Sequence, residues 1–425
     1  MMRVTVLAVL LLMGCDQSGK TISVERQGEV HSMVDVVEKI KFDCSPEVFP
    51  EVHSSVNELF DYARWIQKNN QLKRDVTVDL EIERLYRIAA EHGHAKANIN
   101  LQNGSMRGRF HVRSHEHLRF SQDLVDSDVA TGYYLIAFFL QRGAAGLEQD
   151  EEMALRYFKK AADKGSAQAQ YYLAEKLGRA RTAPEVAKKM YRCAAEQGHA
   201  KAAVSLAIDL KSKGDYVGAL QMFQLGASSG DESGASWLGK AFRNPPPTDE
   251  LYYMGQEEDQ ERAERYKKIW KVLANYSYAK PKVPEIDQIV PLPPAKLPSW
   301  DGKLQWLEER LANFPPPKPD EWLIEKLAKE KGLDPATGRP MPGSPAFKAE
   351  YFPAATCESN QPCPQEGYWK VMWPESWVQN DELIQHFNEG DLMPHPEGSY
   401  YIYRVWPLPR KLVKGPMQVK WGLLG

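Results

Sequence analysis

Through the middle of the chain, apolar residues recur at helical spacing in short segments that end near a glycine. In residues 151–163, alanine, tyrosine, phenylalanine and alanine stand at i, i+3, i+4 and i+7 counted from Ala154, which places them on one face of a helix. Asp150 can cap the start of this helix, and Gly165 can take the left-handed conformation that ends it. The pattern therefore predicts pairs of short helices joined by tight turns.

The turn between the helices recurs as a motif. It reads AAEHGHAKA from Ala89, AADKGSAQA from Ala161, AAEQGHAKA from Ala194 and, in a degenerate copy, GASSGDESGA from Gly226. A further copy, SDVATGYYLIA, has Ser127 in the glycine position. Counted at 93, 127, 165, 198 and 230, the steps are 34, 38, 33 and 32 residues. A period of this length predicts a solenoid of stacked helix pairs, because one pair cannot cover its own apolar stripe.

These residues resemble the Sel-like repeat of the tetratricopeptide superfamily, over residues 81–274. The resemblance implies a mainly α fold, an α/α helical-repeat solenoid, whose concave groove holds a protein partner. Placing the repeats on the tetratricopeptide pattern points nine side chains into that groove, the tyrosines being the best candidates. They are Tyr133, Tyr171, Gln168, Glu175, Lys96, Asn103, Lys201, Lys211 and Lys240. The alternative is that these are merely solvated polar positions.

Residues 1–14 read as a secretory signal, with Arg3 followed by an apolar run too short to span a bilayer. The run ends in Leu-Met-Gly-Cys, which resembles a bacterial lipobox and implies lipidation of Cys15. Asp16 resembles an inner-membrane retention signal. The resemblance therefore predicts a lipoprotein on the periplasmic face of the inner membrane. The alternative is a plain secretory signal with an incidental cysteine.

Length and composition allow two or three domains of an ordinary globular protein. The net charge of −3 gives no electrostatic reason to expect nucleic acid as a partner. We expect the signal peptide at 1–14, a tether with a short strand at 15–50 and the solenoid at 51–274. A proline-rich linker with two short amphipathic helices follows at 275–346, and a small β-rich, barrel-like module at 347–425. The linker motifs LPSWDGKLQWLEER and KEKGLDPATG resemble an uncharacterised region that accompanies Sel-like repeats in some bacterial lipoproteins.

The last module contains CESNQPCPQEGYWKVMW, and alternating residues near Tyr368 and Tyr400 predict strands. Few apolar residues are available in so small a module, so a disulfide between Cys357 and Cys363 would stabilise it in an oxidising compartment. A zinc site that used His386 and His395 is the alternative. Cys44 and Cys193 are expected to be free. The pattern CPxxGYW followed by GDxMP resembles a small β-barrel module of immunity proteins in bacterial polymorphic-toxin systems.

Two further segments match metal-binding or catalytic motifs only weakly. The stretch FHVRSHEHLRF holds His111, His115 and His117, but the interspersed arginines repel a cation, so a solvated loop or a partner-contacting insertion is preferred to a metal site. GASSG matches the nucleophile-elbow pattern centred on Ser228, but that chemistry needs a strand before the serine and a helix precedes it here. No cofactor, metal or catalytic residue is therefore expected.

The chain is interpreted as a binding protein and not an enzyme. Sel-like repeat lipoproteins with such a last module resemble the immunity proteins encoded beside phospholipase effectors of type VI secretion. The resemblance implies binding and inhibition of a secreted toxin, with the membrane reached through the lipid anchor. The alternative is a scaffold for cell-envelope machinery.

Overall fold

A computed structural model describes residues 41–180, 183–347, 356–365, 367–373, 383–402 and 411–424. The predicted signal segment, the lipidated Cys15 and the tether up to residue 40 lie outside the described residues. The chain divides into two compact units. The first contains residues 1–52, 68–73 and 93–316, and the second contains residues 53–67, 74–92 and 317–425. The predicted domain boundaries stay predictions.

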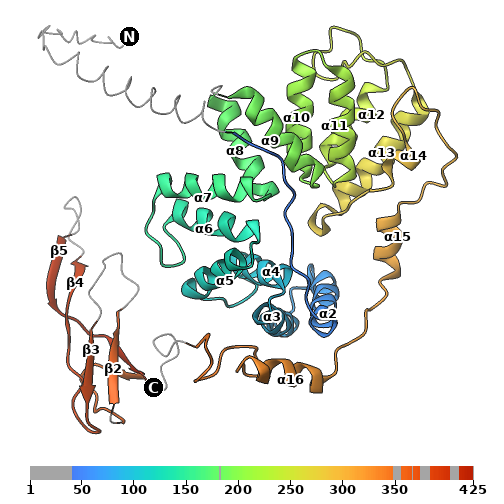
Figure 1. Ribbon diagram of the computed structural model, residues 1–425. Helices are drawn as coiled ribbons and strands as arrows, with labels where there is room; N and C mark the ends of the chain where they lie inside the picture. Colours follow the sequence, from blue (N-terminus) through green and yellow to red (C-terminus); the bar gives the residue numbers. More distant parts are fainter. Residues whose placement is uncertain are drawn as a thin grey trace, which may run out of the picture. The chain divides into compact units, whose positions relative to one another are not determined.

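The first unit is an array of antiparallel helices in which each helix packs on the next one along the chain, from α4 to α13 (Figure 1). This confirms the predicted helical-repeat fold. The helices are α4 Ala95–Met106, α5 Ser114–Asp126, α6 Ala130–Arg142, α7 Glu151–Asp163, α8 Ala167–Ala180, α9 Pro184–Glu196, α10 Ala200–Ser212, α11 Tyr216–Ser228, α12 Glu232–Ala241 and α13 Gln260–Asn275.

At the turns after α7, α9, α10 and α11, a left-handed glycine follows one helix, and the next residue caps the following helix with its side chain. Gly165 has φ +107 and ends α7 as predicted, while Asp150 caps the start of that helix. After Gly198, His199 accepts a hydrogen bond from the Ala202 N–H through Nδ1 at 3.2 Å. One assignment from the sequence was wrong by a residue. Asp128 (φ +58), and not its neighbour Ser127, takes the glycine position, because aspartate tolerates this conformation.

Small residues let neighbouring helices approach closely. The paired alanines before each turn, such as Ala161 and Ala194, are fully buried. Gly234 lies inside α12, and a Cβ added there would come within 2.6 Å of the carbonyl oxygen of Phe223 on α11. A larger side chain at this position would push the two helices apart, so the glycine is required by packing.

The stretch 104–122 is mostly helical, which corrects the expectation of a solvated loop. It leads into α5, and His117 of that helix is buried. The two ring nitrogens of His117 hydrogen-bond with Gln102 Oε1 and Ser105 Oγ, each at 3.1 Å. This imidazole therefore holds α5 against α4.

The chain after α13 folds back over the last repeats. It forms the short helices η1 Ser277–Ala279, α14 Ile286–Ile289 and α15 Gln305–Ala312. The Val283 N–H donates to the carbonyl of Ser228 at 2.8 Å, and Gln224 Nε2 donates to the carbonyl of Val290 at 3.0 Å. Tyr266 of α13 donates its hydroxyl to Gln224 Oε1, and burial raises the pKa of this phenol. The proline-rich region is therefore fixed to α11 and α13 over this stretch.

The second unit contains most of α2 Ser54–Asn70, α3 Val76–Glu91, α16 Glu321–Glu330 and the last module. Arg84 of α3 forms a salt bridge with Glu321 of α16 at 2.7 Å and donates through Nε to the carbonyl of Pro335. Gly338 lies so close to α3 that a Cβ added to it would be 2.7 Å from the carbonyl oxygen of Arg84. The GLDPATG motif is thus a turn that docks on α3.

The last module contains strands, as its alternating sequence predicted, and they pair antiparallel. Its four-stranded sheet has the order β1-β6-β2-β3, and a separate pair joins β4 and β5. The strands are β1 Thr356–Glu358, β2 Gly367–Met372, β3 Ile384–Phe387, β4 Glu397–Ile402, β5 Lys411–Pro416 and β6 Lys420–Leu424. Trp369 and Trp421, fully buried, fill its core.

The predicted disulfide between Cys357 and Cys363 was wrong, because both residues are free, buried thiols in the structure. Cys363 Sγ donates to the carbonyl of Gln365 at 3.0 Å, and Cys357 Sγ lies 3.5 Å from the carbonyl of Pro362. Burial raises the pKa of the Cys357 thiol, which makes it a poor nucleophile at neutral pH. The argument for a staple underestimated how much core two tryptophans supply.

Candidate protein-binding surface

The predicted groove residues divide into one that is buried and several that meet in two surface clusters. Tyr133, one of the two preferred contacts, is 8% exposed. Its ring lies 6.2 Å from that of Tyr157, and Lys160 Nζ stands 4.6 Å from its centroid. It therefore belongs to the core between α6 and α7, and this expectation is corrected: little of the ring can reach a partner.

Tyr171 and Glu175 form the first cluster, on α8 and beside α10. The half-buried Tyr171 ring stacks on His199 with centroids 4.5 Å apart, and its hydroxyl donates to Glu175 at 2.9 Å. The Tyr191 ring of α9 lies 6.0 Å away. Burial, then Glu175, raises the pKa of the Tyr171 hydroxyl, while burial lowers the pKa of the His199 imidazole. This is an aromatic surface whose edge carries the Glu175 carboxylate, which forms a salt bridge with Arg179 at 3.6 Å.

Lys211 and Lys240 belong to a second cluster, at the end of α10 and on α12. Lys211 Nζ stands 5.6 Å from the ring centroid of Trp237, and Lys240 Nζ stands 4.1 Å from that of Tyr252. The two rings meet edge to face with centroids 5.3 Å apart. Each ammonium is held over an aromatic face, an arrangement worth about 0.5–1 kcal/mol at an exposed site. Two cations and two rings are thereby ordered before any partner arrives.

The other predicted groove residues do not join these clusters. Lys96 is exposed and stands 5.3 Å from the ring centroid of Phe49. Asn103 is half-buried, whereas Gln168 and Lys201 are exposed.

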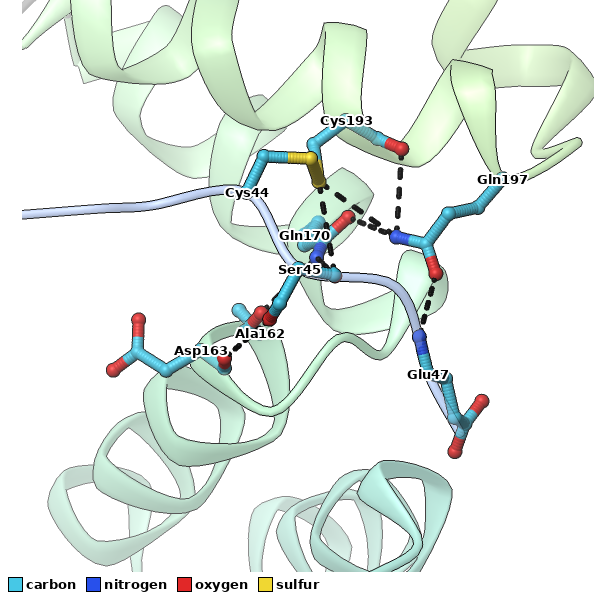
Figure 2. The surroundings of a disulfide bond; sticks show 8 residues. All are labelled: Cys44, Ser45, Glu47, Ala162, Asp163, Gln170, Cys193 and Gln197. Atoms are coloured by element: carbon cyan, nitrogen blue, oxygen red, sulfur yellow. Dashed lines mark hydrogen bonds between the residues drawn. A yellow bond between two sulfur atoms is a disulfide. The ribbon is translucent and has the colours of Figure 1, made fainter. Parts of the chain in front are cut away.

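An edge of the array is already covered by the chain itself. Residues 41–52, the N-terminal strap, run without regular secondary structure over the turns of the repeats (Figure 2). Cys44 is disulfide-bonded to Cys193 of α9, with Cα atoms 5.6 Å apart. Ser45 Oγ donates to the carbonyl of Asp163 at 2.9 Å. The Glu47 N–H donates to Oε1 of Gln197, at the end of α9, at 3.0 Å.

Both cysteines of this disulfide were expected to be free. The sequence gives no local signal for the pair, because 149 positions separate the partners. Cys193 lies in a repeat helix and so resembled an ordinary buried thiol. Only the fold shows that the strap crosses the end of this helix.

Glu47 extends the attachment of the strap to α6, whose own N-cap residue offers no side-chain acceptor. The Glu47 carboxylate accepts a hydrogen bond from the backbone N–H of Thr131 and another, at 3.0 Å, from the Thr131 hydroxyl. Burial raises the pKa of the Glu47 carboxyl, although these two hydrogen bonds oppose that effect. The strap thus supplies a helix cap from a distant part of the chain.

The weak chemical motifs acquire no catalytic geometry. Ser228 is the last residue of α11, so no strand precedes it as a nucleophile elbow requires. Across the ranges that the structure describes, no three histidine, cysteine or carboxylate side chains gather as metal ligands. Over the same ranges, no helix has the length and apolar character needed to cross a bilayer.

Sequence reasoning found the lysines of the second cluster but missed Trp237, Tyr252 and His199. The signal for His199 was present, since histidine follows the turn glycine in two motif copies and takes the N-cap position there. Tyr252 lies outside the repeats, so their period could not place it.

Comparisons with known proteins agree with the fold. Residues 130–166 and 167–199 match the family described as Sel1 repeat, and residues 234–341 match a domain of unknown function, DUF6396. No curated protein matches the chain.

Several solved structures are similar in part. PA5086 from Pseudomonas aeruginosa is 25% identical, with 60% of this chain and 96% of that chain covered and a TM-score of 0.44. Immunity protein PA5088 from the same organism is 25% identical, with 60% and 94% covered and a TM-score of 0.47. A Sel1 repeat protein from Oxalobacter formigenes is 17% identical, with 59% and 95% covered and a TM-score of 0.36. The matches over residues 130–199 establish that this helical array contains Sel1 repeats.

Proposed function

We propose that this chain is a periplasmic immunity protein, held on the inner membrane by lipid at Cys15. In this role it binds a secreted phospholipase effector of a type VI secretion system and blocks it by protein–protein contact. The observation that carries the proposal is the pair of aromatic and charged clusters on α8, α10 and α12 of the Sel1-repeat array. Tyrosine and tryptophan dominate the energetics of protein interfaces, and both clusters are ordered by internal contacts.

Two further features support the location. The Cys44–Cys193 disulfide fits an oxidising compartment such as the periplasm. The lipobox-like sequence before Cys15 fits export and acylation. A membrane tether raises the effective concentration of an inhibitor against an enzyme that attacks that membrane.

The proposal predicts that a gene beside this chain's own encodes a secreted lipase, and the test is co-expression with that lipase. We expect growth to be rescued when this chain is exported, and the two proteins to elute as one complex from size-exclusion chromatography. A variant in which a cleavable secretory signal without a lipidated cysteine replaces residues 1–15 should keep the complex but rescue less well. A lipase that stays toxic and elutes alone would contradict the proposal and favour a scaffold in the cell envelope.

A further inference from the structure

The second cluster forms a small surface that we name the lysine–aromatic patch, made of Lys211, Trp237, Lys240, Leu251 and Tyr252. Lys211 Nζ donates to the carbonyl of Glu250 at 2.6 Å, and Lys240 Nζ donates to the Tyr252 hydroxyl at 2.6 Å. Leu251, which lies between these two contacts in sequence, is 52% exposed. The patch therefore combines an exposed aliphatic side chain with two ordered cations.

The charges of the patch are left open toward a partner. Among the described residues, neither Lys211 nor Lys240 forms a salt bridge, and each ammonium is held instead by a neutral acceptor, the Glu250 carbonyl or the Tyr252 hydroxyl. An ammonium has three N–H donors, and within the described part of the chain each lysine of the patch donates a single hydrogen bond. The unused donors suit carboxylate acceptors.

The backbone beneath the patch is fixed. Asp249 accepts hydrogen bonds from the N–H groups of Leu251 and Tyr252 at 3.1 and 3.0 Å, and Trp237 stacks on the buried Phe223 at 5.0 Å. Binding here would order few additional side chains, which lowers the entropic cost of association.

We propose that the lysine–aromatic patch is a recognition site for an acidic segment of a protein partner, one that presents two carboxylates around an apolar side chain. The carboxylates bind Lys211 and Lys240, and the apolar side chain packs on Leu251 and the edge of Trp237. Two lysines on a chain of net charge −3 fall short of the basic surface that a membrane or a nucleic acid requires.

The inference rests on the proposed function, because the partner used in the test is the secreted lipase that the proposed function predicts beside this chain's gene. Titration calorimetry compares the wild type with the double variant Lys211→Glu and Lys240→Glu. The control, Lys189→Glu and Lys271→Glu, makes the same change in net charge at two exposed lysines outside the patch. Circular dichroism melting checks that all three proteins fold.

We expect the patch variant to raise the Kd at least about tenfold and the control to change it by less than about threefold. The affinity of the wild type should also fall with added salt more steeply than that of the patch variant. A patch variant that binds as tightly as the control overturns this inference and leaves the proposed function standing. A wild type that does not bind the lipase overturns both.

Discussion

Breaking the Cys44–Cys193 disulfide should destabilise the first unit. The bond closes a loop of 149 residues in the unfolded chain. In the chain-entropy relation, a loop of this length loses about 17 cal/mol/K, or about 5 kcal/mol at 25 °C. Measured values for disulfides more often lie at about 2–4 kcal/mol, so we expect a loss of about 2–5 kcal/mol for Cys193→Ser.

The consequence for melting follows from the size of the unit. For a folding unit of 150–250 residues, 1 kcal/mol shifts Tm by about 2–4 °C, so the variant should melt about 4–20 °C below the wild type. Differential scanning calorimetry of the wild type with and without dithiothreitol gives the same comparison without a mutation. The variant itself should not respond to the reductant.

The control uses the other two cysteines. The double variant Cys357→Ser and Cys363→Ala removes two thiols that are not bonded to each other, so it should keep the response of the first unit to dithiothreitol. Peptide mapping under non-reducing conditions should find residues 44 and 193 in one cross-linked product. The reasoning is refuted if reduction moves Tm by less than about 1 °C, or if the cross-link joins residues 357 and 363.

Two other changes test the turns and the packing. His199 caps α10 as a neutral acceptor, and burial lowers its pKa, so folding stability should be complete above the unfolded-state pKa of about 6.5 and decline as the pH falls below it. His199→Asn keeps a capping oxygen without a titrating group, and urea midpoints between pH 7.5 and 5.5 should fall less for it than for the wild type; equal falls would contradict the assignment. Gly234→Ala should cost about 1–3 kcal/mol because its Cβ meets Phe223. Gly178→Ala, inside α8 with open space around it, should instead stabilise by about 0.5–1 kcal/mol, and equal urea midpoints for the two variants would show that the close contact is not felt.

The repeats were predictable because their physics is local. Each unit must cap a helix, turn through a left-handed residue and start the next helix, and these requirements show in the sequence within ten residues of Gly165 or Gly198. The wrong assignment at Asp128 also has a local cause. Aspartate can adopt the left-handed conformation of the turn glycine, so the expectation of a small residue selected Ser127 in its place.

The contacts between distant segments were not predictable from the pattern. Nothing near Cys44 indicates that it reaches Cys193, and nothing in the proline-rich segment indicates that its GLDPATG turn packs on Arg84. The burial of Tyr133 was also not predictable from the pattern. Helical spacing places it on a face of α6, but the pairing with α7 determines that this face is buried. The candidate surface was therefore predicted in part, through Tyr171, Glu175, Lys211 and Lys240, and its other aromatic residues came from the fold.

The most direct test of a protein that holds its target without transforming it is the stoichiometry of inhibition. Increasing amounts of this chain are added to a fixed amount of the secreted lipase, and hydrolysis of phospholipid vesicles is measured. A binding inhibitor should abolish activity in proportion to its concentration, with an end point at a fixed molar ratio and full recovery of lipase activity after the complex is dissociated. Inhibition by a small fraction of that ratio, with lipase that cannot be recovered, would mean that the chain acts as an enzyme and would contradict the account.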